Sequence, residues 1–63
     1  MSTRFDVNCW VEFVVSLRAP PGRFRIVRIL PPDRGEPSYR VKGDHEAFER
    51  VARDSELRHW KAQ

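Results

Sequence analysis

Arginine is the residue type that most clearly suggests a chemistry in this sequence. Ten of the twelve basic residues are arginine, and the formal net charge is +3. The charge is unevenly placed, because residues 13–32 hold four arginines and no acid, whereas residues 33–63 hold seven bases and seven acids. A planar guanidinium group suits phosphate, carboxylate and aromatic faces, so the central segment is a candidate for anion contact. Arginine-for-lysine exchange on a surface also needs no functional cause, and composition alone leaves the choice open.

A candidate basic face follows if the odd-numbered residues of the first apolar segment point inward. The opposite face then gathers Trp10 and Glu12 with six cations, which are Arg18, Arg23, Arg25, Arg28, Arg40 and Lys42. In the register expected below, Arg28 lies opposite Arg40, where like charges repel unless an anion or an acid intervenes. A nucleic acid could supply phosphates there and stack a base on Trp10. Alternatively, acids of the chain itself neutralise the face, the candidates being Glu36, Glu46 and Glu49.

Trp10 and Val14 form a second candidate site, a contact with a protein partner. Both lie on the otherwise polar face of the first segment, where large apolar side chains often mark a contact surface. If that segment is an edge strand, it could also pair with a second copy of the chain or with an extended peptide. The alternative is intramolecular, with the C-terminal segment folding over Trp10 and burying it beside Trp60.

Enzymatic chemistry finds little support in the residue pattern. Cys9, His45 and His59 lack the short paired spacing of a zinc site, and an unpaired cysteine among core positions is ordinarily a small buried hydrophobe. The three glycines are isolated, so no phosphate-binding loop is present. A chain of 63 residues buries only about 60% of its surface, which disfavours a deep cleft. We therefore expect no enzyme activity, catalytic residue, metal, cofactor or small-molecule substrate.

Three strands are expected to present these side chains. Apolar residues occupy every odd position from 5 to 17, which predicts a long strand with one buried face. A proline and glycine turn at 18–22 precedes a second strand over 23–30, and a third covers 39–42 after the breakers at 31–37. The inward set of the second strand changes parity, which predicts a β-bulge near Ile26 and Val27. The expected register sets Val27 opposite Val41 and Ile29 opposite Tyr39.

The C-terminal segment is expected to be helical. Phe48, Val51 and Ala52 fall on one face of a helix that would end near Arg53, although the pattern leaves open whether residues 48–53 are helix or strand. The expected fold is mainly β, a small α+β domain over residues 1–63: a three-stranded antiparallel meander with a short C-terminal helix, or alternatively an open β-β-β-α sheet. Its core should contain Phe5, Val7, Cys9, Val11, Phe13, Val15, Leu17, Phe24, Ile26, Val27, Ile29, Tyr39, Val41, Phe48, Val51 and Leu57.

Residues 24–57 carry a recognisable pattern. An apolar residue followed by proline and a loop precedes the three motifs Tyr39-Arg40-Val41-Lys42, Glu49-Arg50-Val51 and Ser55-Glu56-Leu57. This pattern resembles short uncharacterised bacterial proteins, and also the closing half of SH3-like small barrels, in which a late strand precedes a short helical turn. The resemblance implies that the meander curls as a partial SH3-like barrel. It implies no activity and no functional residue.

Together these features predict a small, basic, non-enzymatic protein-interaction module, with self-association as one form of that interaction. The alternative is a nucleic-acid-binding module that uses the arginine-rich sheet face. A single cysteine and the absence of a signal-like or membrane-spanning apolar run favour the cytoplasm and argue against a membrane partner.

Overall fold

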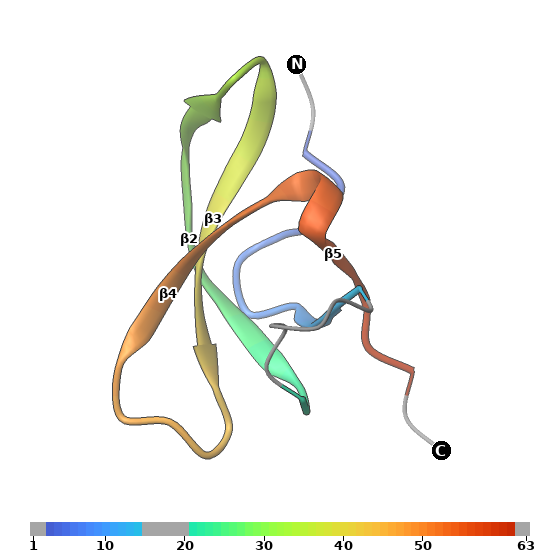
Figure 1. The fold of residues 1–63 in the computed structure, drawn as a ribbon, viewed down its shortest axis with the longest axis vertical. Coiled ribbons are helices and arrows are strands. Elements are labelled where there is room, and N and C mark those ends of the chain that lie inside the picture. The colour runs from blue at the N-terminus through green and yellow to red at the C-terminus, as the bar shows by residue number, and fades with distance from the viewer. Residues whose placement is uncertain (1–2, 15–20, 62–63) are drawn as a thin grey trace.

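Five antiparallel strands make up almost all of the regular structure of the described residues, so the mainly β expectation is confirmed. The computed structural model describes residues 3–14 and 21–61. Within these residues the sheet has the strand order β4-β3-β2-β1-β5 and is strongly bent (Figure 1). The elements are β1 (Trp10–Phe13), β2 (Phe24–Asp33), β3 (Glu36–Gly43), β4 (Glu49–Arg53), the 3-10 turn η1 (Asp54–Glu56) and β5 (Leu57–His59). No helix among the described residues is long and apolar enough to cross a membrane.

The hairpin of β2 and β3 is longer than the sequence pattern indicated. Its two-residue loop, Arg34-Gly35, has φ angles of 55° and 82°, the positive values that a tight hairpin turn of this hand requires. The expected breakers Pro31 and Pro32 lie inside β2, which runs on to Asp33. Proline cannot donate to a ladder, and the register is irregular between Leu30 and Asp33 for that reason.

The expected β-bulge is confirmed. Ile26 pairs with Val41 and Arg28 pairs with Arg40, so Val27 is the extra residue. The expected pairing of Ile29 with Tyr39 is also confirmed, whereas Val27 does not pair with Val41. Arg25 and Arg28 are three residues apart and would face opposite sides of a regular strand, but the bulge restores both to the same side.

The N-terminal segment is the first correction to the expected elements. Strand β1 covers only Trp10–Phe13, and the alternation from residue 5 to 9 does not mark a strand. Asn8 has a φ of 75°, and the Cys9 N–H donates to the Asp6 carbonyl, so the chain turns before β1 begins. Phe5 is fully buried as expected, but Val7 is 48% exposed and is no core residue. Val15 and Leu17 lie outside the described residues.

The C-terminal helix is the second correction, and it removes the β-β-β-α alternative as well. Residues Glu49–Arg53 form β4, which pairs along its whole length with Ser38–Lys42 of β3. In a strand, Ala52 points inward beside Tyr39, while Val51 points outward and is 63% exposed. A helix here would leave the backbone groups on that side of β3 without partners, and the pairing outweighs the weak helical spacing. After η1, β5 turns back and pairs with β1.

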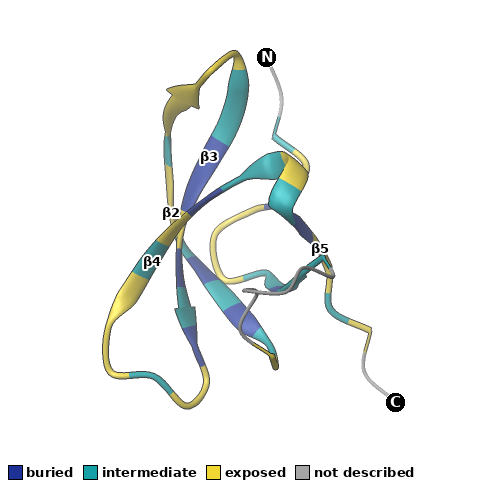
Figure 2. Cartoon of the chain, viewed as in Figure 1, coloured by how far each residue is buried: buried dark blue, intermediate teal, exposed yellow. Residues whose placement is uncertain are grey.

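The core lies on the inner side of the bend (Figure 2). Its buried apolar members are Phe5, Val11, Phe24, Ile26, Tyr39, Val41, Ala52 and Leu57, with Cys9 and Phe13 packed against them. Edge-to-face ring pairs join Phe5 to Tyr39, with centroids 5.4 Å apart, and Phe13 to Phe24 at 5.1 Å. The expectation was wrong for four residues besides Val7: Val27, which is only half-buried, and the exposed Ile29, Phe48 and Val51.

Candidate nucleic-acid interface

The strand register places most of the expected cations on the outer side of the bent sheet. Directly opposite residues of an antiparallel pair share a face. One row across the sheet therefore joins Trp10, Arg25, Lys42 and Glu49, and a second joins Arg28, Arg40 and Val51. Arg23 joins them two residues before Arg25. We call these cations the basic face: Arg23, Arg25, Arg28, Arg40 and Lys42. Arg18, the sixth expected member, lies outside the described residues.

Trp10 forms one end of this face, and it is covered from within the chain. The Arg23 guanidinium carbon lies 4.1 Å from the centre of the Trp10 ring, and Arg23 Nε donates to Asp44 Oδ2 at 2.9 Å. The ring is half-buried as a result. Beside it, the Trp60 N–H donates to the Trp10 carbonyl at 3.1 Å, so the chain after β5 continues alongside β1. Both tryptophans therefore border the basic face.

The expected partner site at Trp10 and Val14 is altered by the topology. Strand β1 lies between β2 and β5, so it is an inner strand and cannot pair with a second copy as an edge. Val14 is half-buried just after β1, and its N–H donates to the Glu56 carbonyl at 2.9 Å. Neither residue presents a widely exposed apolar surface.

Internal acids neutralise only part of the basic face. Glu46 binds Arg50, with Arg50 Nη2 at 2.6 Å from Glu46 Oε2, and Glu36 accepts from the Ser55 N–H at 2.8 Å. The hydrogen bond from Arg50 lowers the pKa of Glu46 and that from Ser55 lowers the pKa of Glu36, so both carboxylates are committed elsewhere. Only Glu49, of the three expected acids, reaches the face, where its Oε1 lies 3.6 Å from Arg40 Nε.

Three cations of the basic face consequently have no carboxylate partner in the part of the chain that is described: Arg25, Arg28 and Lys42. Arg25 Nη1 donates to the neutral Asn8 side chain at 2.9 Å. Arg28 is exposed and lies directly opposite Arg40. This part of the sheet therefore carries an excess of positive charge in an arrangement that repels itself.

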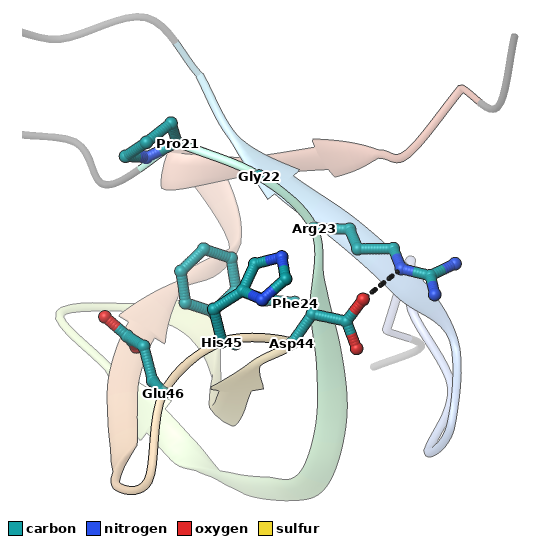
Figure 3. A pocket seen from close by; sticks show the side chains of 8 residues that line it. Pro21, Gly22, Arg23, Phe24, Asp44, His45 and Glu46 are labelled. Atoms are coloured by element: carbon teal, nitrogen blue, oxygen red, sulfur yellow. Dashed lines mark hydrogen bonds and ion pairs between the residues drawn. The ribbon is translucent and has the colours of Figure 1, made fainter.

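A shallow pocket of about 310 Å³ adjoins the basic face between the start of β2 and the loop after β3 (Figure 3). It is lined by Pro21, Gly22, Arg23, Phe24, Gly43, Asp44, His45 and Glu46. Asp44 is bound by Arg23 and Glu46 by Arg50, so neither carboxylate is poised for acid or base catalysis. The volume is at the small end of the range for ligand sites.

The structure brings Cys9 and His59 together, which sequence spacing did not indicate. Cys9 Sγ lies 3.6 Å from His59 Nδ1, and the His59 ring packs edge-on against Phe5 with centroids 4.8 Å apart. His45 lies apart from this pair, on the loop after β3, and no cluster of metal-ligating side chains occurs among the residues described. The zinc site of Cys9, His45 and His59 that the sequence analysis considered is therefore not formed by the described residues.

Sequence reasoning also missed the stacking of Arg23 on Trp10 and the exposure of Phe48 and Val51. The opposite charges of Glu12 and Arg58, which pair across β1 and β5, are a signal in the sequence that could have placed Trp60 beside Trp10. Comparisons with protein-family models, with curated proteins and with solved structures found no match. The basic face is therefore the feature of the molecule from which a function can be inferred.

Proposed function

We propose that this protein is a non-enzymatic, cytoplasmic binding module that holds single-stranded nucleic acid on its basic face. The observation that carries the proposal is the bulge at Val27, which sets Arg25 and Arg28 on the same side as Arg40 and Lys42. The bent sheet serves as the scaffold, which we take to be a partial SH3-like barrel. The passage from β4 into η1 supports that assignment, because the resemblance implies a late strand followed by a helical turn.

Electrostatics favours a polyanion as the ligand. Three cations lack a carboxylate among the described residues, and the facing pair of Arg28 and Arg40 destabilises the free protein. A phosphate placed between the two guanidinium groups would turn this repulsion into two charge-assisted contacts. Each phosphate neutralised also releases condensed counterions, which strengthens binding at low salt.

The aromatic border of the face favours a single strand over a duplex. Trp10 and Trp60 are both half-buried, so part of each side chain remains open to solvent. Stacking of an unpaired base on an aromatic ring contributes roughly 1 to 3 kcal/mol and tolerates any base. Arg23, which already packs on Trp10, can extend such a stack through its planar guanidinium group.

The test compares two charge reversals with the same change in net charge. Arg28→Glu alters the basic face, whereas Arg34→Glu alters the exposed tip of the hairpin between β2 and β3. Fluorescence anisotropy with a labelled mixed-sequence single strand should show binding by the wild type that weakens from about 50 mM to about 200 mM salt. Arg28→Glu should lower the affinity about tenfold or more, because it removes one phosphate contact and adds a repulsive charge.

Arg34→Glu should change the affinity much less, since it lies away from the face. Circular dichroism of both variants serves as the control for folding. Equal losses in the two variants would mean that net charge alone drives the binding, and the proposal of a specific face would be wrong. Absence of binding by the wild type at low salt would overturn it as well.

A further inference from the structure

The outer edge of β4 is the second surface of this molecule that suggests a partner. Strand β4 pairs with β3 on one side and is the edge strand of the sheet on its other side. Figure 1 shows no described segment along this outer side. Among the described residues, the two most exposed large apolar side chains belong to Val51 of β4, which is 63% exposed, and to Phe48 just before this strand, which is 57% exposed. An edge strand with free backbone groups and exposed apolar side chains is a template for another strand.

The sequence of β4 is complementary to itself. In an antiparallel pair of two copies centred on Val51, the Val51 side chains lie opposite each other, and Glu49 of each copy lies opposite Arg53 of the other. Centring the pair on Arg50 or Ala52 instead would form neither of these charge pairs and would place Arg50 against Arg50 or Val51 against Arg53. Opposite charges stabilise a cross-strand pair, and like charges destabilise it, so the sequence selects one register.

We propose that two copies of this chain associate through β4 in this register, forming a symmetric dimer with one continuous sheet. The two charged residues are available for it. The charged groups of Glu49 and Arg53 make only long ion pairs within the chain, 3.6 Å to Arg40 and 3.8 Å to Glu56, compared with 2.8 Å for the pair of Arg4 and Asp54. The backbone N–H of Arg53, by contrast, donates to Glu56 Oε1 at 2.8 Å, so the free backbone groups of this edge are those before Arg53. The interface is isologous, because the same strand serves both copies.

The register also fixes how the two copies face. Directly opposite residues share a side of the sheet, and Val51 lies in the row of Arg28 and Arg40 on the outer side. The dimer therefore presents both basic faces on the same side, with the two Val51 side chains at the centre. An edge-to-edge contact of this size is small, so the dimer should be weak and should dissociate on dilution.

Sedimentation velocity of the purified chain, from about 10 µM to about 1 mM, tests the proposal without any ligand. The weight-average mass should rise toward that of a dimer across the series. Val51→Lys should keep the chain monomeric throughout, because it sets two ammonium groups opposite each other. The matched control is Val7→Lys, which changes another half-exposed valine on the N-terminal segment and should dimerise like the wild type.

Charge reversal tests the register itself. Glu49→Arg and Arg53→Glu should each be monomeric alone, since each sets like charges opposite each other. An equimolar mixture of the two variants should form a heterodimer, because each variant then meets opposite charges: one charge pair keeps its original polarity and the other is reversed. Circular dichroism confirms that each variant is folded.

A monomeric wild type at every concentration would overturn the proposal, as would identical behaviour of the two valine variants. Failure of the mixture to associate, with the wild type dimeric, would reject this register. None of these outcomes bears on nucleic-acid binding, because the measurements contain no nucleic acid. The proposed function and the dimer therefore fail separately.

Discussion

Arg28 shows most directly how a single side chain links the fold to the proposed function. It lies opposite Arg40, and Arg28 has no carboxylate partner among the described residues, since the long 3.6 Å contact of Glu49 is with Arg40. A protein selected for stability alone gains nothing from two arginines in this position. Its charge is useful if it binds a phosphate, and the free protein is then less stable because of it.

We predict that Arg28→Glu makes the folded protein more stable while it weakens nucleic-acid binding. The new carboxylate faces Arg40, and a cross-strand pair of opposite charges is worth roughly 0.2 to 1 kcal/mol, with the lost repulsion adding to it. Urea unfolding followed by tryptophan fluorescence would measure the free energy of unfolding at low salt, where the difference should be largest. A loss of stability would show that Arg28 makes contacts of structural value.

Tyr39 gives the molecule a specific sensitivity to alkali. Its ring is fully buried against Phe5, and its hydroxyl donates to Asp54 Oδ1 at 2.8 Å. Burial, and then the hydrogen bond and charge of Asp54, raise the pKa of Tyr39 above its ordinary value of 10.0. The unfolded chain therefore loses the phenolic proton at a lower pH than the folded chain does. Stability from this group is complete below about pH 10 and declines as the pH rises through the pKa of the folded state.

Tyr39→Phe should separate this effect from the general response to alkali. Near neutral pH the variant should lose about 1 kcal/mol with the hydrogen bond, because Arg4 still binds the other Asp54 oxygen. Above about pH 10 the gap between variant and wild type should close, since the phenylalanine variant has no phenol to ionise. Urea unfolding midpoints measured at several pH values would show whether this stability difference closes. A difference that stays constant with pH would contradict the assignment of the alkaline effect to Tyr39.

Hydrogen bonds from Arg4 connect the N-terminal segment to η1 and to the first residue of β5. Arg4 donates from Nε to Asp54 Oδ2 at 2.8 Å, and from Nη2 to the carbonyls of Asp54 at 2.8 Å and Leu57 at 2.9 Å. These bonds hold Phe5 in place between Tyr39 and His59. A single ammonium group cannot reproduce the fork of donors.

Arg4→Lys should therefore cost about 1 to 2 kcal/mol, more than an exposed ion pair ordinarily contributes, because two of the three acceptors are backbone carbonyls. Arg34→Lys, at the exposed hairpin tip, provides the matched control and should be neutral. Chemical denaturation measures the difference. Equal stability of the two variants would mean that solvent replaces the Arg4 contacts without loss.

The pairing of β2 with β3 could be predicted from the sequence because both strands are long and their apolar residues alternate with polar ones on either side of a single change of parity. The bulge followed from the change of parity at Ile26 and Val27, and the pairing of Arg28 with Arg40 followed from the expected register, which sets Ile29 opposite Tyr39. The C-terminal strands could not, because β5 has three residues and β4 has five. In so short a segment, Val51 beside Ala52 fits one face of a helix as well as two faces of a strand.

The candidate site was predictable to the same extent as the hairpin. Rows of cations follow from period two, so Arg25, Arg40 and Lys42 could be placed on one face. The sequence could not predict which acid forms an ion pair with which base. In the structure Glu46 pairs with Arg50, whereas Glu49 pairs with Arg40. That choice depends on the path of the loop after Gly43, and local spacing does not determine it.

In the whole molecule, dimerisation through β4 would affect nucleic-acid binding, since the dimer would extend the basic face across two copies. Arg28 and Arg40 of both copies would then lie along one row, with Val51 at the centre. A strand long enough to contact both faces would bind the second face intramolecularly, which raises affinity without any new kind of contact. A short strand that covers one face would gain nothing from dimerisation.

We therefore predict that the ratio of affinities for a long and a short single strand depends on β4. For the wild type, at concentrations where it is dimeric, the ratio should reach roughly 10²-fold, the low end of bivalent gains. For Arg53→Glu the ratio should fall to a small factor, which arises because a longer strand offers more positions at which one face can bind. Mixing this variant with Glu49→Arg should restore the large ratio. Taking the ratio within each protein removes the effect of the altered charge on either affinity alone. Fluorescence anisotropy with two lengths of the same sequence makes the measurement, and an unchanged ratio in Arg53→Glu would show that the two faces act independently.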